Sequence, residues 1–188
     1  MNTPNKLTLL RIVLVPVFVV LLLVDSIPYH TLWALIVFVA ASLTDMADGK
    51  IARKRGLVTN FGKFLDPLAD KVLVLSALVC FVELGVTEAW VVIVILAREF
   101  LVTSLRLVAA DGGQVIAASG WGKLKTAFTM LAITAILLLG ALSDLMVFPI
   151  WFPVDWVARV LMWIAMLLTL ISGVDYLWKN RGCIDSTK

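Results

Sequence analysis

The sequence predicts an all-α integral membrane protein, a bundle of six transmembrane helices with a polar site that faces the cytoplasm. Hydrophobic residues make up 62% of the 188 residues and charged residues only 15%, against about 45–50% and ~25% in soluble domains. The mean hydropathy is +1.03. Because a soluble globule cannot carry so little polar surface, these values exclude a soluble enzyme, a disordered chain and a nucleic-acid-binding module.

Six apolar runs define the expected helices in chain order. They cover residues 7–24, 31–53, 64–84, 88–109, 122–142 and 154–178, and a helix needs about 20 residues to cross a bilayer. Only helices and closed barrels satisfy their backbone polar groups in lipid, and the runs lack the polar alternation of barrel strands. No small-residue cleavage site follows the first run, so we expect a retained span there. The runs nearly exhaust the chain, which predicts one membrane domain over residues 1–188.

The distribution of basic residues predicts the orientation of the helices. Lysines and arginines gather in the N-terminal tail, the second-to-third connection, the fourth-to-fifth connection and the C-terminal tail: Lys6, Lys50, Arg53, Lys54, Arg55, Lys63, Lys123, Lys125, Lys179, Arg181 and Lys188. The three loops on the opposite side contain none. Cytoplasmic segments of membrane proteins are enriched in these residues. Both termini and the polar site are therefore expected on the cytoplasmic side of the cell membrane.

Four aspartates stand out inside apolar runs, where carboxylates are costly. Asp45 and Asp48 lie three residues apart near the inner end of the second run, and Asp66 and Asp70 lie four apart at the start of the third. Each interval brings both positions to one helix face. Four carboxylates at one membrane depth would repel one another unless cations offset their charge. An oxygen-only ligand set suits two Mg²⁺ or Mn²⁺ ions, the usual clamp for displacement at phosphorus.

Small residues accompany the aspartates. Gly49 and Ala52 share the helix face of Asp45, and Gly62 precedes Asp66 by four residues. Residues without bulky side chains leave space in which a base or a phosphate can approach the backbone. The alternative for Gly49 is close packing between helices.

These residues form one continuous pattern, Asp-x2-Asp-Gly-x2-Ala-Arg-x8-Gly-x3-Asp-x3-Asp, which starts at Asp45 and ends at Asp70. The pattern resembles the signature of the CDP-alcohol phosphatidyltransferases, with every position and spacing intact. Further segments resemble the bacterial branch of that family whose acceptor is sn-glycerol 3-phosphate. They begin at Pro4, Phe61, Arg98, Ser104 and Gly122.

The resemblance implies a function and a role for each matched residue. The chain would transfer the phosphatidyl group from CDP-diacylglycerol to sn-glycerol 3-phosphate in phospholipid biosynthesis, with two Mg²⁺ or Mn²⁺ ions, as a homodimer in the bilayer. Asp45, Asp48 and Asp66 would be metal ligands, and Asp70 the general base and a further ligand. The expected CDP-diacylglycerol site is Asn5, Thr8, Asp45, Gly49, Ala52, Arg53 and Gly62.

The acceptor phosphate needs cations. The best candidates are Arg106 and Lys125, with Lys63 and Arg98 as further candidates. Arg98 has two interpretations of equal weight, a pair with Glu99 that holds helices together or a contact with the acceptor phosphate. Two alternatives remain open for the function. One is the same reaction with inositol phosphate, serine or a second lipid as acceptor, and the other is a small cation transporter.

Overall fold

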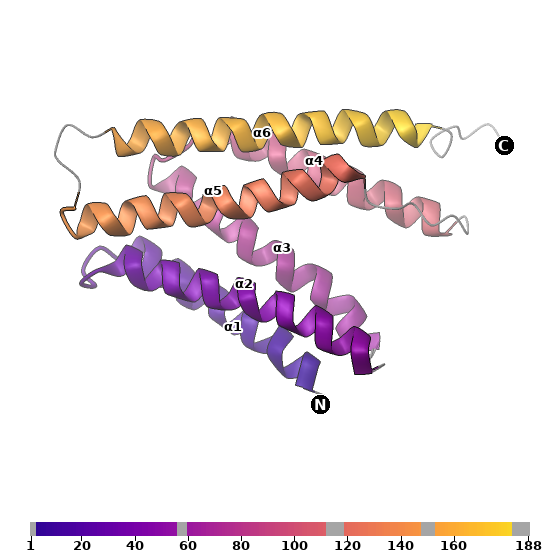
Figure 1. The fold of residues 1–188 in the computed structure, drawn as a ribbon, viewed down its shortest axis with the longest axis horizontal. Helices are drawn as coiled ribbons and strands as arrows, with labels where there is room; N and C mark the ends of the chain where they lie inside the picture. Colours follow the sequence, from indigo (N-terminus) through magenta and orange to yellow (C-terminus); the bar gives the residue numbers. More distant parts are fainter. Residues whose placement is uncertain (1–2, 56–59, 112–118, 148–152, 182–188) are drawn as a thin grey trace. The chain divides into compact units, whose positions relative to one another are not determined.

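The computed structural model describes the backbone of residues 3–55, 60–111, 119–147 and 153–181. Side chains are described for residues 9–44, 71–109, 119–147 and 153–181. The described chain contains six α-helices, labelled in Figure 1: α1 Thr3–Leu23, α2 His30–Arg55, α3 Asn60–Glu83, α4 Ala89–Asp111, α5 Gly120–Asp144 and α6 Val154–Lys179.

Each apolar run of the sequence corresponds to one of these helices. The helices reach further than the runs at their polar ends: α1 begins at Thr3, α2 continues to Arg55 and α3 begins at Asn60. An apolar run shows only the hydrophobic part of a helix, whereas the backbone hydrogen bonds of the helix can continue into the polar residues on either side. After α3, Gly85 has a φ of +69°, the left-handed conformation that commonly follows a helix end.

The chain divides into two compact units, with boundaries between α3 and α4, within α5 and at the start of α6. The first unit is Met1–Leu84 with Ile133–Val154, and the second is Gly85–Ala132 with Asp155–Lys188.

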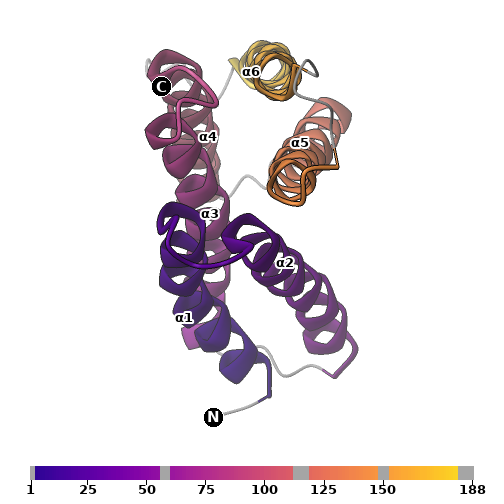
Figure 2. The same ribbon diagram turned by 90° about the vertical axis from the view of Figure 1, so that its left-hand side faces the viewer.

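In the first unit, α1 packs along both α2 and α3 (Figure 2). The buried rings of Phe18 on α1 and Phe38 on α2 lie with their centroids 5.7 Å apart. At the opposite end of this unit from the aspartate positions, Nε2 of His30 lies 3.8 Å from Asp25 and 3.9 Å from Asp144. The end of α5 therefore lies beside the α1–α2 turn.

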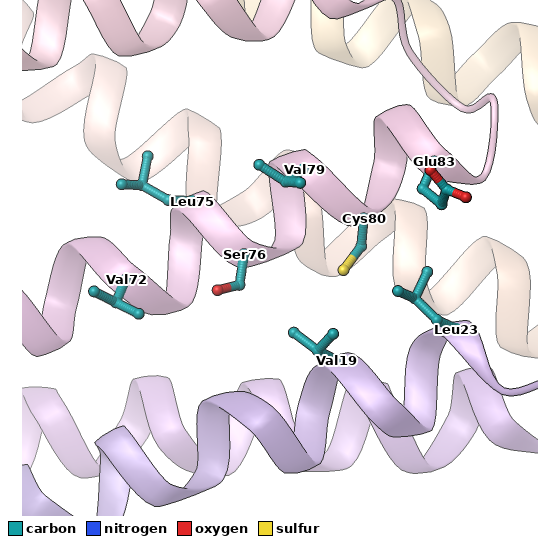
Figure 3. A pocket seen from close by; sticks show the side chains of 8 residues that line it. All are labelled: Val19, Leu23, Val72, Leu75, Ser76, Val79, Cys80 and Glu83. Carbon is teal, nitrogen blue, oxygen red and sulfur yellow. The ribbon is translucent and has the colours of Figure 1, made fainter.

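An apolar groove of about 480 Å³ lies between α1 and α3. Its lining is Val19, Leu23, Val72, Leu75, Ser76, Val79, Cys80 and Glu83. Figure 3 shows Val19 of α1 opposite Ser76 and Cys80 of α3, with Glu83 at the end of the groove beside Leu23. The groove follows one face of α3, because its residues on that helix recur at intervals of three and four.

The second unit contains α4, the first half of α5, and α6. Helix α6 buries Ala158, Met162, Ala165, Met166, Thr169, Ser172, Gly173 and Tyr176. Its exposed face carries large apolar side chains: Trp163, Ile164, Leu167, Leu170, Ile171, Val174 and Trp178. A helix of a soluble protein has the reverse arrangement, with polar groups outside. The arrangement of α6 suits a surface in contact with lipid.

Two of the described helices, α5 and α6, are long and apolar enough to cross a membrane, while the apolar segments Leu9–Leu23 and His30–Thr44 are shorter. Helix α4 is of similar length but carries Arg98, Glu99 and Arg106 within its apolar sequence. Helices α4 and α6 run in the same direction. Glu88, just before α4, accepts a hydrogen bond from Trp163 and pairs with Arg159 in the first half of α6, and Arg106 near the end of α4 contacts Tyr176 near the end of α6.

Candidate active site

The four aspartates occupy two consecutive helices of the first unit. Asp45 and Asp48 belong to α2, and Asp66 and Asp70 belong to α3. Both pairs keep the helical intervals that place their positions on one face. Their side chains lie outside the described residues, as do the side chains of the other residues expected there: Asn5, Thr8, Gly49, Ala52, Arg53, Gly62 and Lys63.

The donor set of these aspartates fits divalent cations of the magnesium type. All four donors are carboxylates, and two neighbouring helices each contribute two of them. Mg²⁺ and Mn²⁺ prefer oxygen ligands of this kind. The side chains that the structure describes contain no group of three or more His, Cys, Asp or Glu residues that could hold a metal ion.

In the second unit, a polar cluster joins α4 to α5. Glu99 on α4 receives hydrogen bonds from Lys125 on α5 and from its own neighbour Arg98, whose Nη1 lies 3.2 Å from Glu99 Oε1. Lys125 is buried, with 6% of its surface exposed. Burial of a lysine is costly unless an acidic partner compensates its charge. The Glu99 carboxylate therefore stabilises Lys125 inside the unit.

Arg98 also reaches α6. Its Nη2 donates a hydrogen bond of 2.5 Å to Oγ of the buried Ser172. The next residue, Gly173, packs directly against the aliphatic part of Arg98, since a methyl group built at Gly173 would lie 2.9 Å from Arg98 Cγ. Gly122 of α5 is close to the same place, near Ser172 Oγ and Arg98 Nη2. Small residues on α5 and α6 thus make room for the arginine.

Arg106 is held by a different kind of partner. Its Nε donates a hydrogen bond of 3.1 Å to the hydroxyl of Tyr176, and its guanidinium carbon lies 5.3 Å from the centre of the Tyr176 ring. The tyrosine is buried, with 1% of its surface exposed, whereas Arg106 is exposed.

The cluster favours an anionic ligand. Arg98, Arg106 and Lys125 supply three positive charges, and Glu99 supplies one negative charge. A guanidinium recognises a phosphate through paired hydrogen bonds, and an ammonium binds it as a point charge. Both types of donor occur here on neighbouring helices.

Sequence reasoning identified the three cations but missed their partners on α6. Ser172, Gly173 and Tyr176 resemble ordinary residues of an apolar span. The available signal was their spacing: polar or small residues at intervals of one, three and four near the end of α6, where most of the neighbouring residues, apart from Asp175 and Lys179, are large and apolar. That spacing alone does not indicate which helix they face.

The described chain is all-helical, with two aspartates on each of α2 and α3 and with three cations around Glu99 and Tyr176 in the second unit. Residues 1–171 match the family model of CDP-alcohol phosphatidyltransferases, and the chain belongs to that family.

Among its relatives is the CDP-diacylglycerol–glycerol-3-phosphate 3-phosphatidyltransferase of Bacillus subtilis (strain 168), 46% identical over 95% of both chains. The probable phosphatidylglycerophosphate synthase of Mycobacterium tuberculosis (strain H37Rv) is 44% identical over 93% of this chain and 79% of its own length. The CDP-diacylglycerol–glycerol-3-phosphate 3-phosphatidyltransferase of Rickettsia bellii (strain RML369-C) is 39% identical over 93% of both.

Proposed function

We propose that this chain transfers the phosphatidyl group of CDP-diacylglycerol to sn-glycerol 3-phosphate, which yields phosphatidylglycerol phosphate and CMP. The observation that carries the proposal is the 46% identity, over 95% of both chains, to a relative named for that reaction. The cation cluster of Arg98, Arg106 and Lys125 supports it, because this acceptor brings its own phosphate to the site.

The reaction is a single displacement at phosphorus. Asp70 accepts the proton of the acceptor hydroxyl, whose oxygen forms a bond to the phosphorus that bears diacylglycerol. The bond from that phosphorus to the oxygen of CMP breaks, and CMP leaves with the electron pair. A carboxylate is a weak base for an alcohol, but proton transfer only needs to accompany bond formation. No covalent enzyme intermediate is required.

Asp45, Asp48, Asp66 and Asp70 would hold two divalent cations, Mg²⁺ or Mn²⁺. When bound, these ions supply positive charge against the pyrophosphate and the departing CMP. Asp45, Asp48 and Asp66 would serve as ligands of these ions, whereas Asp70 would also act as the base. The nucleotide portion lies along Asn5, Thr8, Gly49, Ala52, Arg53 and Gly62, and the small residues of this set let it approach the helix backbone.

The acceptor phosphate binds to Arg106, Lys125 and Arg98, with Lys63 as a further contact. The described geometry supports this assignment in one respect. Arg106 is exposed and held by an uncharged partner, so its charge is available to a ligand.

The protein is proposed to be a multi-pass protein of the cell membrane, with six spans, both termini in the cytoplasm and the site at that surface. Its substrates suit this place, since the acyl chains of CDP-diacylglycerol lie in the bilayer and its headgroup lies at the surface. The parallel course of α4 and α6 supports the topology, because two even-numbered spans must cross in the same direction. We further propose a homodimer, as the family resemblance implies.

Cysteine labelling tests the topology. After Cys80 and Cys183 are replaced by serine, one new cysteine is introduced at Ser26 or at Lys179, both of which are exposed. In intact cells, a membrane-impermeant maleimide is expected to label the cysteine at position 26, whereas the cysteine at position 179 reacts only after the membrane is opened. Labelling of both from the same side would contradict six spans.

An acceptor panel tests the function itself. Purified protein with CDP-diacylglycerol and Mg²⁺ is offered glycerol 3-phosphate, inositol 1-phosphate or serine, and CMP release is measured. We expect turnover with glycerol 3-phosphate. Preferred turnover with another acceptor would keep the reaction class and reject this acceptor, whereas ion flux without CMP release would indicate a transporter.

A further inference from the structure

Arg98, Lys125 and Arg106 of the second unit have two different kinds of partner. Arg98 and Lys125 both contact the carboxylate of Glu99. Among the described side chains, Arg106 contacts the ring and hydroxyl of Tyr176 and no carboxylate. The carboxylate reduces the net charge of the first two cations, whereas Tyr176 leaves the charge of Arg106 undiminished.

The contact also fixes the direction of the guanidinium. Its Nε donates a hydrogen bond to the tyrosine hydroxyl, 3.1 Å away. The guanidinium carbon lies over the Tyr176 ring, 5.3 Å from its centre. The two terminal nitrogens, Nη1 and Nη2, then remain available to donate paired hydrogen bonds to an oxyanion. Tyr176 is 1% exposed, so packing holds its ring in place beside the exposed guanidinium of Arg106.

We propose that Tyr176 is a positioning residue that aims Arg106 at the phosphate of the acceptor and so determines how well a phosphorylated acceptor is bound. This inference rests on the proposed function. The contacts between Tyr176 and Arg106 in this chain support it. Tyr176 itself lies outside residues 1–171, the part of the chain that the family model matches. Tyr176 acts through Arg106 and touches no reacting atom.

Two substitutions at this position separate the hydroxyl from the ring. Tyr176→Phe removes the hydrogen-bond acceptor and keeps the ring, and Tyr176→Leu removes both. The matched control is Tyr29→Phe, because Tyr29 is the other tyrosine of the chain and lies exposed in the α1–α2 turn. All variants are made in the full chain, and their thermal inactivation is compared with that of the wild type to confirm folding.

The measured quantities are the KM values for glycerol 3-phosphate and for CDP-diacylglycerol and the kcat at saturation. We expect Tyr176→Phe to raise the KM for glycerol 3-phosphate roughly 2- to 13-fold, the effect of one lost hydrogen bond. Tyr176→Leu should raise it roughly 5- to 60-fold, because the cation–π contact is lost as well. The KM for CDP-diacylglycerol and the kcat should stay at wild-type values, and Tyr29→Phe should change none of them.

A double-mutant comparison tests the route through Arg106. When Arg106 is already alanine, Tyr176→Phe should cause no further rise in the KM for glycerol 3-phosphate. An additive effect of the two substitutions would overturn the proposal, as would equal increases in the KM of both substrates, which indicate a structural role.

The wild-type protein separates this inference from the proposed function. If it turns over glycerol 3-phosphate and Tyr176→Phe leaves every constant unchanged, the positioning role is wrong and the function stands. If it fails to turn over glycerol 3-phosphate, the proposed function is wrong and the inference falls with it.

Discussion

Two groups of charged residues differ in how far apart their members lie in the sequence. One is the set of aspartates on α2 and α3, and the other is the basic cluster of α4, α5 and α6. The four aspartates lie within one stretch from Asp45 to Asp70, and the two members of each pair are three or four residues apart, which places them on one helix face. The contacts of the basic cluster join residues 26, 70 and 74 positions apart in the chain. A local pattern can be recognised in one sequence. A pairing between distant helices requires the fold.

The largest expected effect lies on the acidic side. Asp45→Asn or Asp66→Asn should abolish turnover, because each would remove a charged ligand from the proposed pair of cations. The measurement is CMP release across a Mg²⁺ titration. Asp25→Asn, at an exposed position of the first unit, is the control and should retain activity. Near-normal turnover of either site variant at saturating Mg²⁺ would contradict the two-metal assignment.

The next effect distinguishes the base from the ligands. Asp70→Asn should keep CDP-diacylglycerol binding but lower the rate of the chemical step about 10²- to 10⁴-fold, since an amide cannot accept the proton. Single-turnover kinetics with pre-bound CDP-diacylglycerol measure this step. A loss of binding with an unchanged rate would assign Asp70 to substrate binding instead.

On the basic side a smaller and more selective effect is expected. Arg106→Ala should raise the KM for glycerol 3-phosphate roughly 10- to 150-fold, the effect of a lost charge-assisted hydrogen bond, and change the KM for CDP-diacylglycerol far less. Lys179→Ala is the control, because it removes an exposed cation that pairs with Asp175 on its own helix. If Arg106→Ala affects both substrates equally, the acceptor must be sought around Lys63 and Arg98.

The smallest effect concerns packing around Arg98. A methyl group at Gly173 would lie 2.9 Å from Arg98 Cγ, whereas a methyl group at Gly122 meets no atom closer than 3.5 Å. Overpacking costs about 1–3 kcal/mol, and the better helix propensity of alanine returns about 1 kcal/mol. In reversible unfolding in detergent, Gly173→Ala should therefore be destabilising by up to about 2 kcal/mol, and Gly122→Ala neutral or stabilising. Equal stabilities would contradict the close contact.

The same contrast explains how far the sequence predicts this protein. All six helices follow from apolar runs, because hydrophobic length is a local property. The helix ends at Thr3 and Arg55 were not predicted, because polar residues can continue a helix without changing hydropathy. Within the candidate site, Arg98, Arg106 and Lys125 were predicted as cations for the acceptor, since charge in an apolar span is conspicuous.

The partners of those cations on α6 could not be predicted. A serine or a tyrosine in an apolar span is unremarkable until another helix places an arginine beside it, as α4 does for Ser172 and Tyr176. The pair of Arg98 with Glu99 was one of two interpretations of the sequence, and the additional contact of Glu99 with Lys125 was not predicted. Its contact with Arg98 follows from their adjacency, but its contact with Lys125 depends on how α5 packs against α4.

That shared carboxylate has a consequence for discrimination among metabolites. An anion that approaches Lys125 must compete with Glu99, which already occupies the ammonium group. A metabolite with a single carboxylate brings no more charge than the resident one and gains nothing from the exchange. A phosphate ester, with up to two charges near neutral pH, does gain. If the acceptor phosphate binds at Lys125 as proposed, a monocarboxylate would therefore compete with it poorly, because it offers no more charge than Glu99.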